Sequence, residues 1–521
     1  MKKICFILLF QISWSAVFSQ FPNIKIDDSG NPEEPSIFIN PKNTDNRVAG
    51  ANINFAYNSF DAGRTWVKQE LYSDWGVWGD PCIITDTAGR FYFFHLSNPL
   101  ANGNWIDRII CERSEDGGNI WSNKSFTGLN GTKAQDKAWS CVNPKTNEIY
   151  VTWTQFDKYG SADPTDSSNI LFSKTQDEGI TWSVPLRINR KAGDCLDSDN
   201  TAEGAVPCIG SNGEIFVVWS KSDSLLFNRS TDDGATWLSE NIVVAAQPGG
   251  WDYSIPGYYR CNGMPVTRCD LSASPNHGTI YVNWSDQRNG EDNTDVWLAA
   301  STDGGNTWSA PKKVNDDVSD RHQFLSWLDV DRKTGYVYII FYDRRNYGDW
   351  STDVYLAYST DGGNTFVNDK ISDLPFYPDN SVFLGDYNNL SAYDGKIAPI
   401  WTRQDNAISS VMTAEIDFST LAGSAPSLST GQFMLFQNYP NPFSSATNIK
   451  MKIKQSGNYS LVLYDLFGKK VASLFSEKYL SAGTHNFSLN SAEYHLPGNE
   501  YYYTLYKGNE ATTKKLIFLY H

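Results

Sequence analysis

Short stretches of β-branched and aromatic residues recur along the chain up to about residue 420, separated by segments rich in Gly, Asn, Asp and Ser. Three of the clearest stretches share one order of residue types and end in tryptophan: Ile149–Trp153, Ile215–Trp219 and Ile280–Trp284. Runs of this composition predict strands, and the intervening residues are typical of turns. The pattern therefore predicts an all-β chain.

A second pattern, an eight-residue phrase with Asp at its third place, Gly at its fifth and an aromatic residue at its eighth, occurs six times. The copies are Ser59–Trp66, Ser114–Trp121, Thr175–Trp182, Ser230–Trp237, Ser301–Trp308 and Ser359–Phe366. Their aspartates are 55, 61, 55, 71 and 58 residues apart. A tight turn needs Gly where φ is positive, and a short Asp side chain accepts hydrogen bonds within such a turn. A period of this size predicts an array of small sheets.

The phrase resembles the Asp-box, or BNR repeat, of sialidases and related β-propellers. That resemblance implies that each copy forms the hairpin between the third and fourth strands of a propeller blade, on the face opposite the active site. We therefore expect the six aspartates to hold turns together rather than to take part in catalysis.

The chain contains strands for one further blade that lacks an Asp-box. Lys396–Trp401 and Ser409–Ile416 follow the sixth copy, and Asn23–Asp27 precedes the first repeat. Pairing the N-terminal strand with the last strands would remove exposed sheet edges. We therefore predict a seven-bladed β-propeller over residues 20–418, made of six Asp-box blades and a closing blade.

The composition changes after the predicted propeller. A linker rich in Ser, Thr, Ala and Gly is expected over residues 419–432, followed by a domain over residues 433–521. This domain carries Phe436–Phe443, Leu463–Lys470 and Leu496–Gly498, in an order that resembles the type A sorting domain of the type IX secretion system of Bacteroidota. The resemblance implies a small β-sandwich that the secretion machinery recognises, with release or attachment at the cell surface. A carbohydrate-binding β-domain is the alternative.

The first residues have the features of a signal peptide. Lys2 and Lys3 precede the apolar run Ile4–Phe10, and Val17–Ser19 fits a cleavage site, so we expect a signal peptide over residues 1–19. The apolar run is too short to span a bilayer, and no transmembrane anchor is expected elsewhere. The protein is thus expected to be secreted or displayed on the outer membrane.

The formal charge is −16, and it becomes −18 once the two lysines of the signal peptide are removed. This excess of negative charge argues against nucleic acid as a partner, although a local basic site for an acidic glycan could coexist with it. Seven cysteines follow the signal peptide, in no spacing typical of zinc sites. Cys261 with Cys269, and Cys195 with Cys208, are candidate disulfides, with buried free thiols as the alternative.

Comparison of the repeats with one another identifies two candidate catalytic residues. His95 stands where other repeats have Trp153, Trp219 and Trp284, and Tyr342 stands where others have Thr or Ser. Both can move protons, although each could instead be a packed core residue. Asp343 and Glu203 complete the set of candidate catalytic residues.

Charged residues gather at the strand ends and blade entrances expected to surround the propeller axis. The candidate substrate-binding residues are Arg288, Arg344, Arg345, Arg403, Arg321 and His322. Lys137 and the carboxylates of Asp80, Asp136, Glu203 and Asp386 lie at other entrances. Guanidinium groups would bind an anionic sugar, and blade-to-blade salt bridges are the alternative. We predict no cofactor or metal, although the entrance carboxylates are of the type that binds Ca²⁺.

The longest connection, Ala245–Pro265, accounts for the 71-residue spacing and contains Trp251, Tyr258 and Tyr259. Flat aromatic rings suit the C–H faces of sugars, whereas packing of the loops against each other is the alternative. We include the three residues among the candidate substrate-binding groups.

These observations predict a secreted, glycan-cleaving propeller whose partner is a polysaccharide or glycoconjugate. The resemblance implies a sialidase-like glycoside hydrolase. The seven-blade count also fits polysaccharide lyases that act on uronic-acid polymers, such as ulvan lyases, in which His or Tyr and Arg carry the reaction. A non-catalytic protein that binds glycans at the cell surface is the third hypothesis, because one fold serves many functions.

Overall fold

The computed structural model describes residues 21–519 except 101–102, 423–432, 466–468, 495–499 and 509. The predicted signal peptide, most of the predicted linker and two parts of the sorting motif, 466–468 and 496–498, lie outside the described residues. The chain divides into two units, Met1–Ile416 and Asp417–His521. Each unit is described by itself below.

The first unit consists mainly of seven antiparallel sheets, numbered 1 to 7 along the chain. Sheet 1 contains β2 (Ser36–Ile39), β3 (Arg47–Ala51), β4 (Phe55–Ser59) and β5 (Val67–Glu70). Sheet 2 contains β6 (Cys82–Thr85), β7 (Phe91–Leu96), β8 (Ile109–Ser114) and β9 (Ser122–Thr127). Sheet 3 contains β10 (Ala134–Val142), β11 (Ile149–Phe156), β12 (Ser168–Thr175) and β13 (Leu186–Arg187).

The next three sheets repeat this order of strands. Sheet 4 contains β14 (Glu203–Ile209), β15 (Ile215–Lys221), β16 (Ser224–Ser230) and β17 (Ile242–Ala246). Sheet 5 contains β20 (Val266–Cys269), β21 (Ile280–Asp286), β22 (Asp295–Ser301) and β23 (Lys312–Lys313). Sheet 6 contains β24 (Gln323–Val330), β25 (Val337–Asp343), β26 (Asp353–Ser359) and β27 (Val367–Lys370). Before sheet 5, β18 (Asp252–Tyr253) pairs with β19 (Cys261–Asn262) within the long connection.

Sheet 7 joins the two ends of the unit. It contains β28 (Asn389–Tyr393), β29 (Lys396–Asp405), β30 (Ile408–Ala414), β31 (Ile416–Asp417) and the N-terminal β1 (Asn23–Asp27). In this sheet β1 pairs antiparallel with β30, with Asn23 opposite Ala414. The structure thus has the predicted pairing of N-terminal and C-terminal strands.

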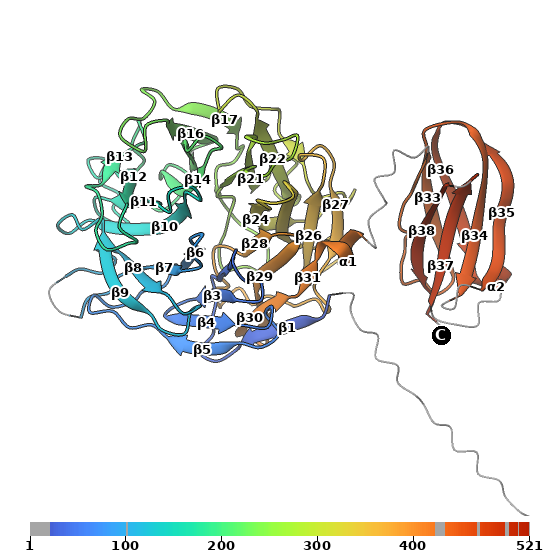
Figure 1. Cartoon of the computed structure of the whole chain (residues 1–521), viewed down its shortest axis with the longest axis horizontal. Coiled ribbons are helices and arrows are strands. Elements are labelled where there is room, and N and C mark those ends of the chain that lie inside the picture. The colour runs from blue at the N-terminus through green and yellow to red at the C-terminus, as the bar shows by residue number, and fades with distance from the viewer. Residues whose placement is uncertain are drawn as a thin grey trace, which may run out of the picture. The chain divides into compact units, whose positions relative to one another are not determined.

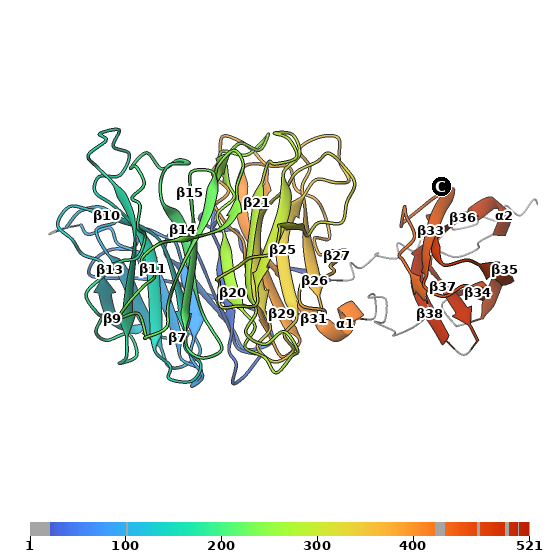
Figure 2. The same ribbon diagram turned by 90° about the horizontal axis from the view of Figure 1, so that it is seen from above.

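The first strand of each sheet is here called its inner strand. Each inner strand contacts the inner strand of the next sheet, and β28 contacts β2, so the seven surround a common axis (Figure 1). Viewed from the side, the strands run between the two ends of this axis (Figure 2). Successive strands of a sheet run in opposite directions, so the six connections from third to fourth strand lie at the end where the inner strands finish.

The six repeated phrases form these connections, and their hydrogen bonds are nearly the same in each copy. In the first, Ser59 Oγ donates to Asp61 Oδ1 at 2.8 Å and accepts from the Gly63 N–H at 2.9 Å. Asp61 Oδ1 also accepts from the Thr65 N–H at 2.9 Å. The same interactions recur in the fifth copy, where bonds from the Thr307 side chain and backbone lower the pKa of Asp303 to about 2. The aspartates therefore hold turns together in this structure.

Tryptophans on the second strands fill the space between sheets. Trp153, Trp219, Trp284 and Trp401 are among the largest fully buried side chains. Large rings at this position bury much apolar surface, which stabilises the contacts between neighbouring sheets. The seven cysteines of the described residues are free thiols, so neither candidate disulfide is formed.

The second unit contains two antiparallel sheets. One consists of β32 (Phe433–Leu435), β33 (Ala446–Ile453) and β36 (Gly483–Asn490). The other consists of β35 (Lys470–Leu480), β34 (Gly457–Asp465), β37 (Glu500–Lys507) and β38 (Glu510–Ile517). Two short helices, α1 (Phe418–Ala422) and α2 (Ser491–Tyr494), complete the unit. The predicted all-β class is thus confirmed.

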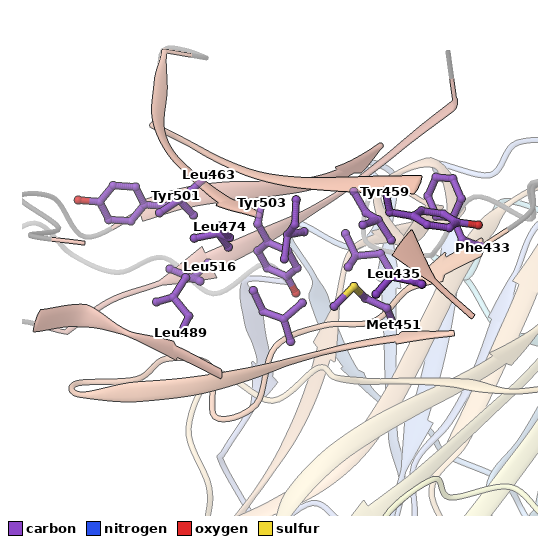
Figure 3. Close-up of a cluster of buried hydrophobic side chains, with 14 of the residues drawn as sticks. Phe433, Leu435, Met451, Tyr459, Leu463, Leu474, Leu489, Tyr501, Tyr503 and Leu516 are labelled. Atoms are coloured by element: carbon purple, nitrogen blue, oxygen red, sulfur yellow. The ribbon is translucent and has the colours of Figure 1, made fainter. Parts of the chain in front are cut away.

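Both sheets of the second unit contribute to one hydrophobic core, shown in Figure 3. Its buried side chains include Leu435 and Met451 from one sheet and Leu463, Tyr503 and Leu516 from the other. On β33, buried and exposed residues alternate strictly, which is the pattern of a strand with one face on a core and one in water.

We expect a variant lacking residues 21–27 to be less stable than the full-length protein, because it loses β1 and exposes the edge of β30. The melting temperature should fall by about 5 °C or more, with more aggregation on heating, as measured by differential scanning calorimetry and light scattering. Lys25→Ala, which removes only an exposed ion pair with Asp28, is the control and should melt within about 1 °C of the wild type. An unchanged melting temperature after the deletion would contradict a closing role for β1.

Candidate active site at the start of the inner strands

The starts of several inner strands share an unusual backbone. Glu34, Asp80, Lys137 and Leu325 have φ between 47° and 54°, a region that residues other than glycine rarely adopt. The pairing of inner and second strands also shifts in register within β10, β14 and β24. Left-handed residues and bulges of this kind cluster at functional sites. This end of the axis therefore has the backbone features of a functional site.

Lys137 connects four sheets there. Its ammonium lies 2.9 Å from Asp386, 3.3 Å from Asp80 and 3.9 Å from Glu34, which lie at the starts of β28, β6 and β2. All four side chains are at most 10% exposed. The three carboxylates raise the pKa of Lys137 well above its ordinary value although burial opposes this effect. Lys137 is therefore a permanent positive charge on the axis.

Arg260 connects two carboxylates near the surface. Its Nε donates to Asp386 Oδ1 at 2.8 Å, and its Nη1 lies 3.8 Å from Asp197 Oδ2. Arg260 belongs to the predicted long connection, which β18 and β19 close into a small hairpin. Its side chain is 42% exposed, so it separates the buried charges from solvent.

Glu203 is more deeply buried than Arg260, and its carboxylate accepts no hydrogen bond from the described residues. It is fully buried at the start of β14, and no hydrogen-bond donor among the described residues reaches either of its carboxylate oxygens. Burial, then the charges of Asp197 and Asp136, raise the pKa of Glu203 well above its usual range. A protonated Glu203 can donate to the neighbouring carboxylate of Asp197, which also accepts from the Tyr159 hydroxyl. Asp197 and Glu203 are therefore neighbouring carboxyl groups, of which Glu203 has the raised pKa.

The pKa values of the carboxyl groups diverge within this small region. Burial opposes ionisation of Asp386, but Lys137 and Arg260 outweigh burial and lower its pKa. Burial raises the pKa of Glu34, Asp80 and Asp136 to about 7, and that of Glu33 to about 8. Carboxyl groups with opposed shifts are the usual basis for assigning a base and an acid. We refer to Glu33, Glu34, Asp80, Asp136, Lys137, Tyr159, Asp197, Glu203, Arg260 and Asp386 as the acidic axial site.

Exposed aromatic rings lie beside the acidic axial site. Trp105 packs edge-on against Tyr159 at 5.4 Å and against Trp78 at 5.9 Å. The ring of Tyr259 lies 6.1 Å from that of Phe383, over which the Arg260 guanidinium sits at 4.7 Å. Trp78, Trp105 and Tyr259 are each between 39% and 63% exposed, so their faces are available to a ligand.

A second group of aromatic rings closes the site on the side that faces the interior of the ring of sheets. Trp139 lies 4.5 Å from Trp327 and 4.8 Å from Tyr387, and all three rings are buried. We call these three residues the aromatic plug. A cavity of about 20 Å³ between the plug and Lys137 has room for roughly one water molecule. A ligand larger than water must therefore bind on the solvent side of the plug, at the end of the axis where the inner strands start.

Three of the four candidate catalytic residues lie outside the acidic axial site. His95 is buried in β7, where Nδ1 lies 2.8 Å from the Leu96 carbonyl oxygen and Nε2 lies 3.4 Å from Glu112. Tyr342 is buried in β25, and its hydroxyl donates to the Thr402 carbonyl oxygen. Asp343 accepts from Arg345 Nε at 2.7 Å. Glu203 alone is part of the site, and the catalytic roles of the other three stay predictions.

The candidate substrate-binding arginines mostly bind protein groups near them. Arg288 Nε donates to Asp286 at 2.8 Å, and Arg403 Nε donates to Asp405 at 2.6 Å. Arg344 donates to the Pro256 carbonyl oxygen at 2.7 Å, and Arg345 pairs with Asp343 and Asp316. Arg321 is exposed. The structure thus distributes these arginines over several sheets.

The other candidate binding residues have different degrees of exposure. His322 is buried, which lowers its pKa to about 4, and its Nδ1 lies 3.1 Å from Thr294 Oγ1. Trp251 and Tyr258 are buried within the long connection, whereas Tyr259 is 63% exposed. Of the three aromatic candidates in that connection, Tyr259 is therefore the one whose ring is exposed enough to contact a ligand.

Of the ten members of the site, sequence reasoning predicted the position of five and placed Arg260 in the long connection, but it missed the other four. Asp80, Asp136, Lys137, Glu203 and Asp386 were expected at blade entrances. Glu33, Glu34, Tyr159 and Asp197 were not, although the two glutamates immediately precede the first inner strand, as Asp80 precedes the second. This shared position, just before an inner strand, is the feature of the sequence that could have identified the two glutamates.

No group of three or more His, Cys, Asp or Glu in the described part of the chain has the arrangement of a metal site. No helix among the same residues is long and apolar enough to cross a membrane.

A family model described as the secretion system C-terminal sorting domain matches residues 437–519. This match confirms the predicted sorting domain and indicates secretion with attachment at the cell surface. The matched residues lie within the second unit.

The chain is also similar to solved structures at low identity. A Hadza microbial sialidase is 14% identical, with a TM-score of 0.41, and the match covers 72% of this chain and 73% of that one. A protein of unknown function from Dyadobacter fermentans is 10% identical over 76% of this chain and 97% of that one, with a TM-score of 0.42. An ulvan lyase is 13% identical over 76% and 96%, with a TM-score of 0.46. No curated protein matches the chain.

The acidic axial site should make the stability of the protein depend on pH. The pKa values of Glu33, Glu34, Asp80 and Asp136 are raised, so the folded state binds more protons than the unfolded state between about pH 4 and 8. The free energy of unfolding should therefore fall as pH rises through this range, as measured by urea denaturation.

Removal of one buried carboxylate tests the origin of this dependence. Glu203→Gln should increase the free energy of unfolding at pH 8.5 by about 1–3 kcal/mol, because folding must either protonate Glu203 or bury its charge without a donor, and the neutral amide avoids both costs. The gain should be much smaller at pH 5. Glu240→Gln, on the surface, is the control and should change neither value. A Glu203→Gln protein that is less stable than wild type at pH 8.5 would refute a repulsive role for this carboxyl group.

Proposed function

We propose that the first unit is a seven-bladed β-propeller that hydrolyses glycosidic bonds at the acidic axial site, and that the second unit is the β-sandwich that directs its export. The single observation that carries the proposal is the contrast between the lowered pKa of Asp386 and the raised pKa of Glu203, which lies beside Asp197. Arg260 contacts Asp386 and Asp197.

Most glycoside hydrolases use one protonated and one ionised carboxyl group that flank the scissile bond. In the proposed reaction, Asp197 donates the proton to the glycosidic oxygen, and the bond from that oxygen to the anomeric carbon breaks. Asp386 stabilises the positive charge that develops on the sugar, and water supplies the new hydroxyl group and the proton that restores the acid. Glu203 is fully buried, so we assign it the role of a positioning residue that keeps a proton available to Asp197.

The aromatic rings beside the site support a carbohydrate substrate. Trp78 and Trp105 lie on the side of Tyr159, and Tyr259 with Phe383 lies on the side of Arg260. Rings on both sides of a charged centre suit a sugar chain that crosses the site and stacks on each side. This arrangement favours an oligosaccharide or polysaccharide over a single sugar.

A uronate lyase is the second candidate, and one observation favours it. The Tyr159 hydroxyl lies within hydrogen-bond distance of Asp197, and Asp197 lies beside Arg260. A tyrosine for proton transfer and an arginine that neutralises a carboxylate are the residue types that β-elimination needs. A lyase product is an unsaturated uronate that absorbs near-ultraviolet light, whereas a hydrolase releases reducing ends without that absorbance.

Sialidase activity is the narrower expectation from the Asp-box resemblance. It requires arginines that grip the carboxylate of the sugar, and Arg260 is the arginine present in the acidic axial site. Release of the reporter from a fluorogenic neuraminide would assign the protein to this class. A glycan-binding role without cleavage would appear instead as retention in affinity gels that contain intact polysaccharide.

Asp386→Asn and Asp197→Asn should each lower kcat on the polysaccharide that the wild type cleaves by about a thousandfold, because each removes one of the two carboxyl groups. Reducing-sugar release from a panel of algal and host polysaccharides, together with ultraviolet absorbance, is the measurement. Asp163→Asn, on an exposed loop, is the control and should retain wild-type rates.

The same panel tests the predicted roles of His95 and Tyr342. If His95→Gln and Tyr342→Phe lose activity while retaining the wild-type melting temperature, and Asp386→Asn retains activity, then the acidic axial site is not the catalytic centre.

Trp105→Ala should raise KM by about tenfold with little change in kcat, because the loss of one stacked sugar weakens binding without touching the reacting groups. Steady-state kinetics on oligosaccharides of increasing length would measure this effect. Tyr72→Ala, which removes another exposed ring, is the control and should keep the wild-type KM. A fall in kcat alone for Trp105→Ala would contradict a binding role for Trp105.

A further inference from the structure

A second cavity lies at the other end of the axis, where the inner strands finish. Its volume is about 60 Å³, and its lining includes Ile39, Thr85 and Val142, the last residues of β2, β6 and β10. The Asp-box turns lie at this same end. The cavity is therefore separate from the acidic axial site and plays no part in the proposed function.

Two guanidinium groups line this cavity, and they differ in their partners. Arg268 Nε donates to Asp329 Oδ1 at 3.1 Å, and its Nη1 donates to the Thr267 carbonyl oxygen at 2.9 Å. Among the described residues, none accepts a hydrogen bond from Arg332 or forms an ion pair with it. Asp329 is the carboxylate in the lining, and its other oxygen accepts from the Ala392 N–H at 2.8 Å.

The remaining polar groups of the lining add no negative charge. Cys141, Cys208 and Cys269 face the cavity as free thiols, and burial raises the pKa of each, to about 12 for Cys141 and Cys269. They are therefore neutral at physiological pH. Lys333 adds a further positive charge nearby, 5.7 Å from the ring centre of Tyr393, another lining residue.

Arg332 is half-buried, and its guanidinium carries two costs, partial burial and the neighbouring charge of Arg268, which both lower its pKa, whereas the charge of Asp329 opposes them. An anion that accepts from both arginines would remove the two costs together, and the planar fork of a guanidinium matches the oxygens of sulfate, phosphate or a carboxylate. The cavity has room for several water molecules, which is enough for an anion of this size.

We propose that the cavity between Arg268 and Arg332 is a binding site for a small oxyanion, with sulfate as the test ligand. The anion could be free in solution or be the sulfate group of an esterified sugar. Both sources present the same oxygens to the two arginines.

Isothermal titration calorimetry tests the proposal with sodium sulfate and the exported protein, at an ionic strength held constant with sodium chloride. The wild type should bind one sulfate per chain. Arg332→Gln should weaken binding by at least about tenfold, because half of the charge-assisted contacts are lost. Arg187→Gln, which removes an exposed arginine on the outer strand β13, is the matched control and should bind within about twofold of the wild type.

A second measurement does not depend on the folding of a variant. Sulfate should slow the reaction of Cys141 with a thiol reagent in the wild type, because Cys141 is a half-exposed thiol of the lining. Titration with a monosaccharide sulfate ester identifies the source of the anion: binding of inorganic sulfate alone assigns the site to a free anion, and equal or tighter binding of the ester assigns it to a sulfated sugar. The proposal is overturned if the wild type shows no saturable sulfate binding, or if Arg332→Gln binds as tightly as the wild type.

Discussion

The contact of one buried ammonium with carboxylates from three other sheets is the interaction on which the ring depends. Lys137 lies on β10, and its partners Glu34, Asp80 and Asp386 lie at the starts of β2, β6 and β28. Carboxylates so close together could not stay ionised in a buried site without a cation among them. Asp386 comes from the last sheet and Glu34 precedes the first. The same contact therefore closes the ring and assembles the site.

The repeated phrase made the scaffold predictable because it specifies turns by local chemistry. Ser59, Asp61, Gly63 and Thr65 bond to one another within seven residues, so their geometry depends on little else. The charged blade entrances were predictable for a related reason: equivalent positions of a repeat must converge on the axis. Tyr159 and Asp197 lie in irregular connections between strands, where the repeat gives no register, and so they escaped prediction.

Departures from the repeat are accommodated in the layer between neighbouring sheets. His95 replaces a tryptophan, and its ring lies 6.2 Å from Phe93 and beside Glu112, in the layer between sheets.

The arginines predicted to bind substrate mostly pair with aspartates close to them in the sequence. Arg288 and Arg345 each bind the aspartate two residues earlier, in the turns that follow β21 and β25, where the same aspartate also accepts from the backbone N–H of the arginine. Sequence spacing alone could have assigned these arginines to local pairs.

The aromatic plug has a consequence for how any polymer could be handled. Trp139, Trp327 and Tyr387 fill the centre of the ring, and the cavity between them and Lys137 admits little more than water. A chain that reaches the acidic axial site therefore cannot thread through the ring and emerge at the other end of the axis. It must enter and depart by the same mouth, so successive cleavages along one polymer require sideways sliding across the aromatic rim or complete release between events.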